Sequence, residues 1–361
     1  MTPERLHEIT SRYAGLRVAV VGDFRLDRYL EIDPARVETS IETGRTVHNV
    51  VRVRSQAGAA GTIMNNLSAL GVGTLYAIGF CGEDGEGFEL RRALAALSGV
   101  RLDFFEQSAA RRTFTYCKPL VVEPGKPPCE LDRLDSKNWT QTPAELQGRI
   151  AESLRELAPT IDALILMDQV DVPETGVVTR EVCAAAHAAW LATPGLVILA
   201  DSRRSLRDFP PLGFKMNAAE LAALGETQPP LALEQVMQHA AALARRNGQP
   251  VFVTLAERGI VGATGEGVAE HVAALPVRGP IDIVGAGDAV TANLLTALAA
   301  GATTREAMSL AMIAASIVIH QLGTTGTASA SQLLAVVEDN RSSRTQLCRA
   351  MSGNKLGDWD L

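Results

Sequence analysis

The first buried strand is predicted from residues 17–23, which read Arg17-Val18-Ala19-Val20-Val21-Gly22-Asp23. A short run of β-branched and small apolar residues that ends in glycine is typical of a strand with both faces buried, as in a parallel sheet. Similar runs recur at 163–167, 196–200 and 250–255, and alanine- and leucine-rich segments with helical spacing lie between them. This alternation predicts an α/β fold in which a doubly wound, mostly parallel sheet carries helices on both faces.

Two segments interrupt this rhythm, residues 29–56 and 112–135. Within the second, Thr113–Tyr116 and Leu131–Asp135 alternate apolar and polar residues with a period of two, which indicates half-exposed strands. We expect these segments to form a small accessory β-sheet that covers the core as a lid. The main domain is expected to span residues 1–340, and residues 341–361 form a polar tail without a clear period.

Composition excludes several classes of protein. At 361 residues and 47% hydrophobic, the chain can bury one large core. The net charge of −7, with both signs interspersed, leaves no basic face for nucleic acid or for an acidic membrane surface. The N-terminus lacks the apolar stretch of a signal peptide, and no run approaches a membrane span, so we expect a cytoplasmic protein. Cysteines and histidines are dispersed, which argues against a zinc site or a disulfide framework.

The chemistry is predicted from residues 282–288, Asp282-Ile283-Val284-Gly285-Ala286-Gly287-Asp288, which lead into a helical segment at 289–298. The pattern predicts a strand, a glycine turn and a helix. Small residues at Gly285, Ala286 and Gly287 allow free backbone N–H groups to point outward at a helix N-terminus, where the helix dipole adds partial positive charge. Such an anion hole stabilises the equatorial oxygens of a phosphoryl group in transfer.

Asp288 would lie in the first turn of this helix, beside the anion hole. A carboxylate at that point can accept a proton from an alcohol, so Asp288 is the candidate general base. In a loose phosphoryl-transfer transition state the proton leaves late, and positioning matters more than basicity. The alternative is that Asp288 only caps a helix after a glycine turn, which is common for an isolated Gly-x-Gly-Asp.

The segment 282–288 resembles the D-T-x-G-A-G-D signature of the ribokinase-like (PfkB) family of carbohydrate kinases. Residues 254–259 resemble that family's T-x-G-x-x-G phosphate loop, and residues 315–324 resemble the helix and glycine turn below its adenine pocket. The blocks at 21–29 and 58–71 are similar to its two N-terminal substrate motifs. The resemblance spans about residues 16 to 336 and implies an ATP- and Mg²⁺-dependent kinase for a sugar or sugar phosphate, with a monovalent cation as a further possibility.

The resemblance also assigns residues to the site. Those implied to contact the acceptor are Asp27, Gly58, Ala59, Thr62 and Arg133. Those implied to contact the nucleotide are Lys215, Asn217, Thr254, Ala256, Gly259 and Gly323. Asn217 and Glu220 form the family's N-x-x-E element, which implies a magnesium site held partly through water; the same pair also fits a helix capping box. For Asp27 the alternative is an exposed acid paired with Arg25 or Arg28.

The branch of the family is indicated by residues 22–29, which resemble the G-D-x-x-L-D-R-Y of heptose-phosphate kinases, and by residues 133–135, which resemble their R-L-D. Many of those enzymes are fused to a nucleotidyltransferase. No H-x-G-H-like element follows residue 340, so we expect a resemblance to the kinase half only. Arg111, Arg112 and Lys118 are candidates for contacting a phosphate already on the sugar, or they form a solvated face.

The chain departs from the family at Ala57-Gly58, where Gly-Gly is usual, at Thr62, where asparagine is usual, and at Ala256, where glycine is usual. These changes leave two rivals open: a sugar- or nucleotide-binding homologue that has lost turnover, and a kinase for a nucleoside or vitamin alcohol. No glycine-rich loop lies in the context that a dinucleotide-binding dehydrogenase requires. By resemblance, the lid is also expected to pair two chains into a homodimer.

Overall fold

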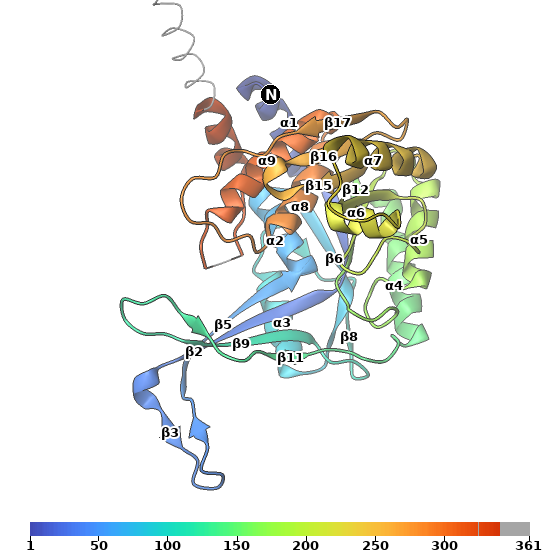
Figure 1. The fold of residues 1–361 in the computed structure, drawn as a ribbon. Helices are drawn as coiled ribbons and strands as arrows, with labels where there is room; N and C mark the ends of the chain where they lie inside the picture. The colour runs from blue at the N-terminus through green and yellow to red at the C-terminus, as the bar shows by residue number, and fades with distance from the viewer. Residues whose placement is uncertain (324, 340–361) are drawn as a thin grey trace, which may run out of the picture.

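The computed structural model describes residues 1–323 and 325–339, and its centre is a ten-stranded sheet between two layers of helices (Figure 1). The sheet runs in the order β17 (Ala269–Val272), β16 (Ile260–Ala263), β15 (Val251–Thr254), β14 (Gly213–Asn217), β13 (Val197–Ser202), β12 (Ala163–Asp168), β1 (Arg17–Gly22), β6 (Thr74–Gly82) and β7 (Val100–Arg101), with β8 (Phe105–Ser108) also paired to β6. Neighbouring strands are parallel except at β16 and β17. The predicted doubly wound sheet is confirmed, and the four predicted strands are β1, β12, β13 and β15.

Two-sided burial explains why the strands are nearly all apolar. In β1, Val18 and Val20 belong to one hydrophobic cluster, whereas Ala19 and Val21 belong to the other. Helices α1 (Pro3–Thr10), α2 (Ala60–Leu70), α3 (Gly85–Ala95), α8 (Ala286–Ala299) and α9 (Thr304–Ile319) contribute to the first cluster. Helices α4 (Ala144–Leu157), α5 (Arg180–Ala192), α6 (Ala218–Leu224) and α7 (Leu233–Asn247) contribute to the second. Because side chains alternate across a strand, each strand supplies both layers.

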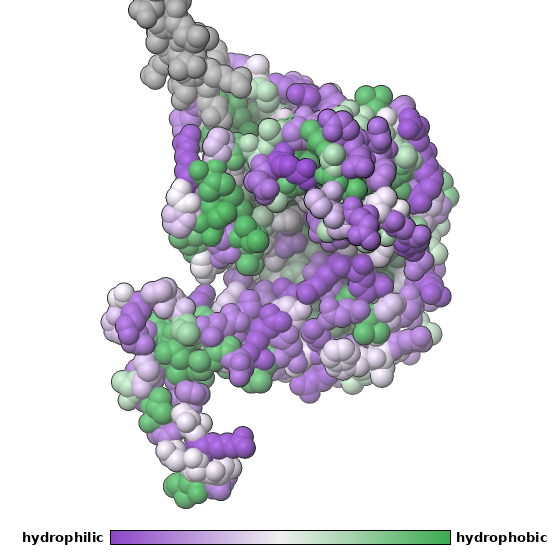
Figure 2. All heavy atoms as spheres, viewed as in Figure 1, coloured by the Kyte–Doolittle hydropathy of each residue, from purple (hydrophilic) through white to green (hydrophobic). Residues whose placement is uncertain are grey.

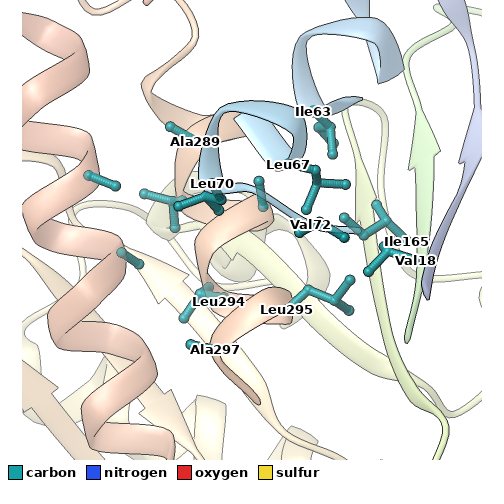
Figure 3. Packing of buried hydrophobic residues seen from close by; sticks show 14 of the residues in the cluster. Val18, Ile63, Leu67, Leu70, Val72, Ile165, Ala289, Leu294, Leu295 and Ala297 are labelled. Carbon is teal, nitrogen blue, oxygen red and sulfur yellow. The ribbon is translucent and has the colours of Figure 1, made fainter. Parts of the chain in front are cut away.

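Helices α2 and α8 pack against each other on one face of the sheet. Figure 3 shows Leu67 and Leu70 of α2 beside Ala289 and Leu294 of α8, all fully or almost fully buried. The packing also brings the starts of the two helices together, because a Cβ placed on Gly285 would lie 3.8 Å from Cγ2 of Thr62. The two helix N-termini that the sequence assigns to substrates therefore open on the same space.

The accessory sheet is also confirmed. Its strands are β10 (Cys129–Glu130), β9 (Phe114–Val121), β2 (Phe24–Ile32) and β5 (Val50–Ala59), with β11 (Leu134–Ser136) paired to β9. A hairpin of β3 (Glu38–Thr39) and β4 (Thr46–Val47) projects from it (Figure 1). In Figure 2 a hollow separates this sheet from the main body. The sheet begins earlier than expected, and Asp27 consequently lies inside β2.

Contacts from β2 and β5 to α3 fix the accessory sheet on the core. Arg28 donates to Glu89 at 2.9 Å, and the Ser55 hydroxyl donates to the same carboxylate at 2.5 Å.

The predicted tail, residues 341–361, lies outside the described residues. Within the described part of the chain, no helix has the length and apolar character needed to cross a membrane.

Candidate active site

A cavity of about 780 Å³ lies between the start of α8, helix α9 and the turn from β15 to β16. Its walls include residues that the resemblance assigns to the nucleotide or to the transferred phosphate: Asn217, Thr254, Ala256, Gly259, Ala286 and Gly287. The remaining wall is mostly apolar, with Val277, Ile283 and Met312 among its residues. Its size and its apolar lining with a few polar groups are typical of a cofactor pocket.

The segment before α8 is a loop and not the predicted strand. Asp282 accepts a hydrogen bond from the Val284 amide at 3.0 Å, and Gly285 turns the chain into the helix with φ 83°. A Cβ on Gly285 would lie 2.6 Å from Cγ2 of Thr325, so both its conformation and its surroundings require glycine. Ile283 is exposed in the cavity wall, where its apolar side chain is available to a ligand instead of to the sheet.

Asp288 lies in the first turn of α8, as predicted, and its side chain is only partly exposed. Burial raises the pKa of this carboxyl to about 7; the ammonium group of Lys215 opposes the shift, and the carboxylate of Asp201 adds to it. Arg25 and Asp27 of the accessory sheet also act on Asp288. The candidate base is therefore within electrostatic reach of both the central sheet and the acceptor residues.

Lys215 lies in β14 beneath the start of α8 and is 7% exposed. Its ammonium group donates to Asp201 of β13 at 2.8 Å, and the Thr291 hydroxyl of α8 donates to the same carboxylate oxygen at 3.0 Å. A Cβ on Gly287 would be 3.4 Å from the Lys215 nitrogen. Burial alone would lower the pKa of Lys215, but the charge of Asp201 and its hydrogen bond raise it overall, so the lysine stays charged.

Asp27 lies on β2 and is 3% exposed, so it is not the exposed acid of the alternative interpretation. Arg25 donates to it at 3.1 Å. Gly58, opposite Arg25 on β5, leaves room for this carboxylate, because a Cβ there would lie 2.3 Å from an Asp27 oxygen. Thr62 is buried in the first turn of α2. The structure thus brings Asp27, Gly58, Ala59 and Thr62 together near Asp288.

Two alanines have backbone conformations that favour glycine. Ala256, at the phosphate loop, has φ 52°, so the departure noted there in the sequence is a strained one. Ala59, which precedes α2, has φ 54° and ψ −117°. The strained position before α2 is therefore Ala59, and not the Ala57 that stands in place of the family's first glycine. Ala59 was assigned to the acceptor by resemblance, but its strain could not be predicted because only the backbone angles reveal it.

We expect Ala256→Gly to stabilise the protein by about 1 kcal/mol, because it removes the cost of a left-handed alanine and loses part of that gain to chain entropy. Urea unfolding measures the change. Ala242→Gly, at an exposed position within α7, is the matched control and should lose about 1 kcal/mol. A loss of stability in Ala256→Gly would contradict the strain.

Arg133 and the other basic residues of the lid have separate surroundings. Arg133 stacks over the Tyr116 ring at 4.2 Å and pairs with Asp135 at 2.8 Å. Arg111 is buried and donates to the backbone carbonyls of residues 140, 141 and 175. Arg112 is exposed and lies 3.8 Å from Asp84, and Lys118 lies over the Tyr29 ring. Arg111 is therefore held by backbone carbonyls of the fold, whereas Arg133 shares the Tyr116 ring with Arg25, the residue that donates to Asp27.

Asn217 and Glu220 form a capping box at the start of α6. The Glu220 amide donates to Asn217 at 2.9 Å, and the Asn217 amide donates to Glu220 at 2.7 Å. Oxygen ligands with spare lone pairs fit a hydrated magnesium ion, and Asn217 lines the cavity of about 780 Å³. In the described ranges no three His, Cys, Asp or Glu side chains gather as a metal cluster. One amide oxygen and one carboxylate are the kind of donor set that a magnesium ion uses together with water molecules.

Three described residues that the resemblance assigns to the nucleotide or metal lie outside the cavity wall: Lys215, Glu220 and Gly323. Gly323 is exposed in the turn that follows α9, with φ 71°. The sequence did not single out Asp201 or Tyr116. The position of Asp201 near the end of a predicted strand was an available signal, because ligands of open α/β sheets gather at such ends.

Comparison with known proteins assigns the chain to a family: the model of the pfkB family carbohydrate kinases matches residues 17–331. The chain belongs to the pfkB family of carbohydrate kinases. As a member it is a carbohydrate kinase, and membership implies ATP-dependent phosphorylation of a sugar. The sequence-based recognition of the family is confirmed.

Similar proteins in the pfkB family include the bifunctional protein HldE of Pelobacter propionicus, 28% identical over 93% of this chain and 66% of that protein. HldE of Magnetococcus marinus is 30% identical over 88% of this chain and 63% of that protein. The chain thus spans slightly less than two thirds of the length of these relatives. Arabidopsis thaliana ribokinase with ribose and ATP has the same fold, with a TM-score of 0.65 and 20% identity over 89% of this chain and 98% of that chain. Escherichia coli phosphofructokinase-2 in complex with substrates and products also has this fold, with a TM-score of 0.67 and 18% identity over 90% of this chain and 98% of that chain.

Proposed function

We propose that this kinase transfers the terminal phosphoryl group of ATP to a hydroxyl of a sugar or sugar phosphate, with Asp288 as the general base. One observation carries the proposal: Asp288 lies in the first turn of α8, whose residues Ala286 and Gly287 line the large cavity, and it is within electrostatic reach of Arg25 and Asp27 on the other side. A base between a nucleotide pocket and a hydroxyl-binding carboxylate is the arrangement that phosphoryl transfer to an alcohol requires.

On the nucleotide side, the apolar wall would hold the base of ATP, and the turn Thr254–Gly259 would lie along its phosphates. The Ala286 amide already donates to the Ile283 carbonyl at 3.2 Å. We therefore assign the stabilisation of the transferred phosphoryl to the amides of Gly287 and Asp288, which have no acceptor within the helix. Asn217 and Glu220 would hold magnesium through water, and magnesium when bound neutralises charge on the phosphates.

On the acceptor side, Asp27 would accept hydrogen bonds from two sugar hydroxyls and Asp288 would take the proton of a third. Gly58, Ala59 and Thr62 would shape the floor of the site, and Arg133 its lid. Closure of the accessory sheet would exclude water and protect ATP from hydrolysis. We also propose that the exposed side of this sheet pairs two chains; light scattering that gives the mass of a single chain would contradict the dimer.

The activity should depend on pH through Asp288. Its carboxyl has a pKa raised to about 7 by burial, and the base acts only when ionised. We therefore expect kcat/KM to fall about tenfold per pH unit as the pH drops below about 7, and to be level above it. Coupled detection of ADP across a panel of sugars and sugar phosphates, heptose phosphates included, measures both the activity and its pH profile. No ADP formation with any acceptor would favour the binding-protein alternative.

A further inference from the structure

A second, smaller crevice lies next to the proposed acceptor residues: its wall includes Ala59, which is one of them, and Arg25, which donates to Asp27. It opens at the carboxyl ends of β1 and β12, between the accessory sheet and the loop that follows β12. The chain leaves β1 toward β6 on one side and later returns to β12 on the other, so these strands flank the point where the strand order reverses. Ligands of open α/β sheets bind at such points.

The size of this crevice limits what can enter it. Its volume is about 20 Å³, compared with about 780 Å³ for the nucleotide cavity. That is room for about one water-sized group, such as a hydroxyl or a terminal hydroxymethyl oxygen. A phosphate ester carries three further oxygens around its phosphorus, so the narrow part of the crevice favours a hydroxyl over a phosphate.

The charges around the crevice are already paired. Lys137 donates to Asp171 at 2.7 Å, and Arg25 donates to Asp27 at 3.1 Å. These are the cations of its wall, and Asp23 in the same wall adds a further acid. The neighbouring Arg133 is paired with Asp135. A phosphate already on the acceptor sugar would have to displace a carboxylate from one of these cations. Sugar hydroxyls, in contrast, can donate to the acids and accept from the cations.

An exposed tryptophan lies at the same place. Trp139 is 69% exposed and lines the crevice together with Tyr116. The guanidinium groups of Arg25 and Arg133 lie 3.9 and 4.2 Å from the centre of the Tyr116 ring. Only 4% of the chain is aromatic, yet three aromatic side chains line this one crevice: Trp139, Tyr116 and the largely buried Phe114. An exposed indole beside hydrogen-bonding groups suits the apolar C–H face of a sugar ring.

We propose that the acceptor is an unphosphorylated sugar or polyol, whose terminal hydroxymethyl group enters this crevice while its carbon skeleton lies against Trp139. The proposal rests on the proposed kinase function and names its substrate class. Lys137, Asp171 and Gln169 are the groups within the crevice wall that would hydrogen-bond the terminal hydroxyl. Trp139 and this trio would set specificity, and Asp288 would not contact this end of the sugar.

The first test compares matched pairs of acceptors, each a neutral six- or seven-carbon sugar and its terminal phosphate ester, in the ATP-coupled assay. We expect kcat/KM to be at least about tenfold higher for the neutral member. A preference for the ester would overturn this inference and leave the kinase function intact. Turnover of neither, with nucleotide binding intact, would overturn both.

The second test uses variants of the crevice. Trp139→Ala should raise KM for the neutral sugar about tenfold with little change in kcat, and Trp139→Phe should restore most of the affinity. Trp190→Phe is the control, because Trp190 stacks on His187 of α5, away from the crevice. Asp171→Asn frees Lys137 and should raise kcat/KM for the phosphate ester at least about threefold relative to the neutral sugar. An unchanged KM in Trp139→Ala, or an unchanged ratio in Asp171→Asn, would argue against this placement of the sugar.

Discussion

Asp288→Asn is expected to lower kcat by at least ~10² while the Kd for ATP changes by less than about threefold. The amide keeps the shape of the carboxylate and the start of α8 but cannot accept the proton of the acceptor hydroxyl. The nucleotide cavity is lined by Ala286 and Gly287 and not by residue 288, so ATP binding should persist. Initial rates at saturating ATP and acceptor, with calorimetric titration of ATP, measure the two effects.

Asp162→Asn is the matched control for Asp288→Asn. Asp162 lies at the amino end of β12, where it accepts from the Arg17 amide at 2.8 Å, and its loss should leave kcat unchanged. Equal losses of turnover and of ATP affinity in Asp288→Asn would indicate a folding defect and contradict the role of base.

Asp288→Asn should also change the free energy of unfolding in a pH-dependent way. The folded-state pKa of Asp288 is raised from its ordinary value to about 7, so between those values the folded protein holds a proton that the unfolded chain has released. Stability from this group is therefore lost as the pH rises through that window. At pH 8 Asp288→Asn should be more stable than the wild type, and at pH 4 the two should be closer. A base buried at a cost to stability is consistent with a functional role.

Much of the fold could be predicted because burial leaves a direct trace in the sequence. Strands buried on both faces, such as β1 and β12, are continuous apolar runs, and period-two alternation marked β9 and β11 of the accessory sheet. The start of α8 was predicted from three small residues before an acid, a pattern with few other structural uses. These features depend on neighbours in the chain.

The remaining features depend on neighbours in space. Ile283 and Val284 are β-branched, so the sequence predicted a strand there, but both side chains are exposed. Ile283 lines the large cavity, and apolar residues that line a cavity look the same in the sequence as apolar residues of a buried strand. Ala59 has an ordinary side chain and an unusual backbone, which no sequence pattern reveals. The pairing of Lys215 with Asp201 joins adjacent parallel strands, and its partner could not be chosen before the strand order was known.

Lys215→Met is expected to destabilise the protein by about 3–5 kcal/mol, because it leaves the carboxylate of Asp201 buried without its cation. Asp201 is 6% exposed and accepts hydrogen bonds from Lys215 and Thr291. In Lys215→Met, only the bond from the Thr291 hydroxyl would remain of these two. The double variant Lys215→Met/Asp201→Leu removes both charges and should recover most of the loss. Lys126→Met, which breaks an exposed pair with Glu123, is the matched control and should change stability by less than about 1 kcal/mol.

The same lysine variant separates two roles that the site allows. If Lys215 contacts ATP phosphates, as the family resemblance implies, the Kd for ATP should rise in Lys215→Met. If it acts from beneath α8, as its pairing with Asp201 favours, the Kd should stay constant. The pKa of Asp288, which the lysine now holds down, should then rise. The acid limb of the kcat profile would move to higher pH, because the base would lose its nearby cation. The measurement is made under conditions where the variant is fully folded, and an unmoved limb with a raised Kd would assign Lys215 to the nucleotide.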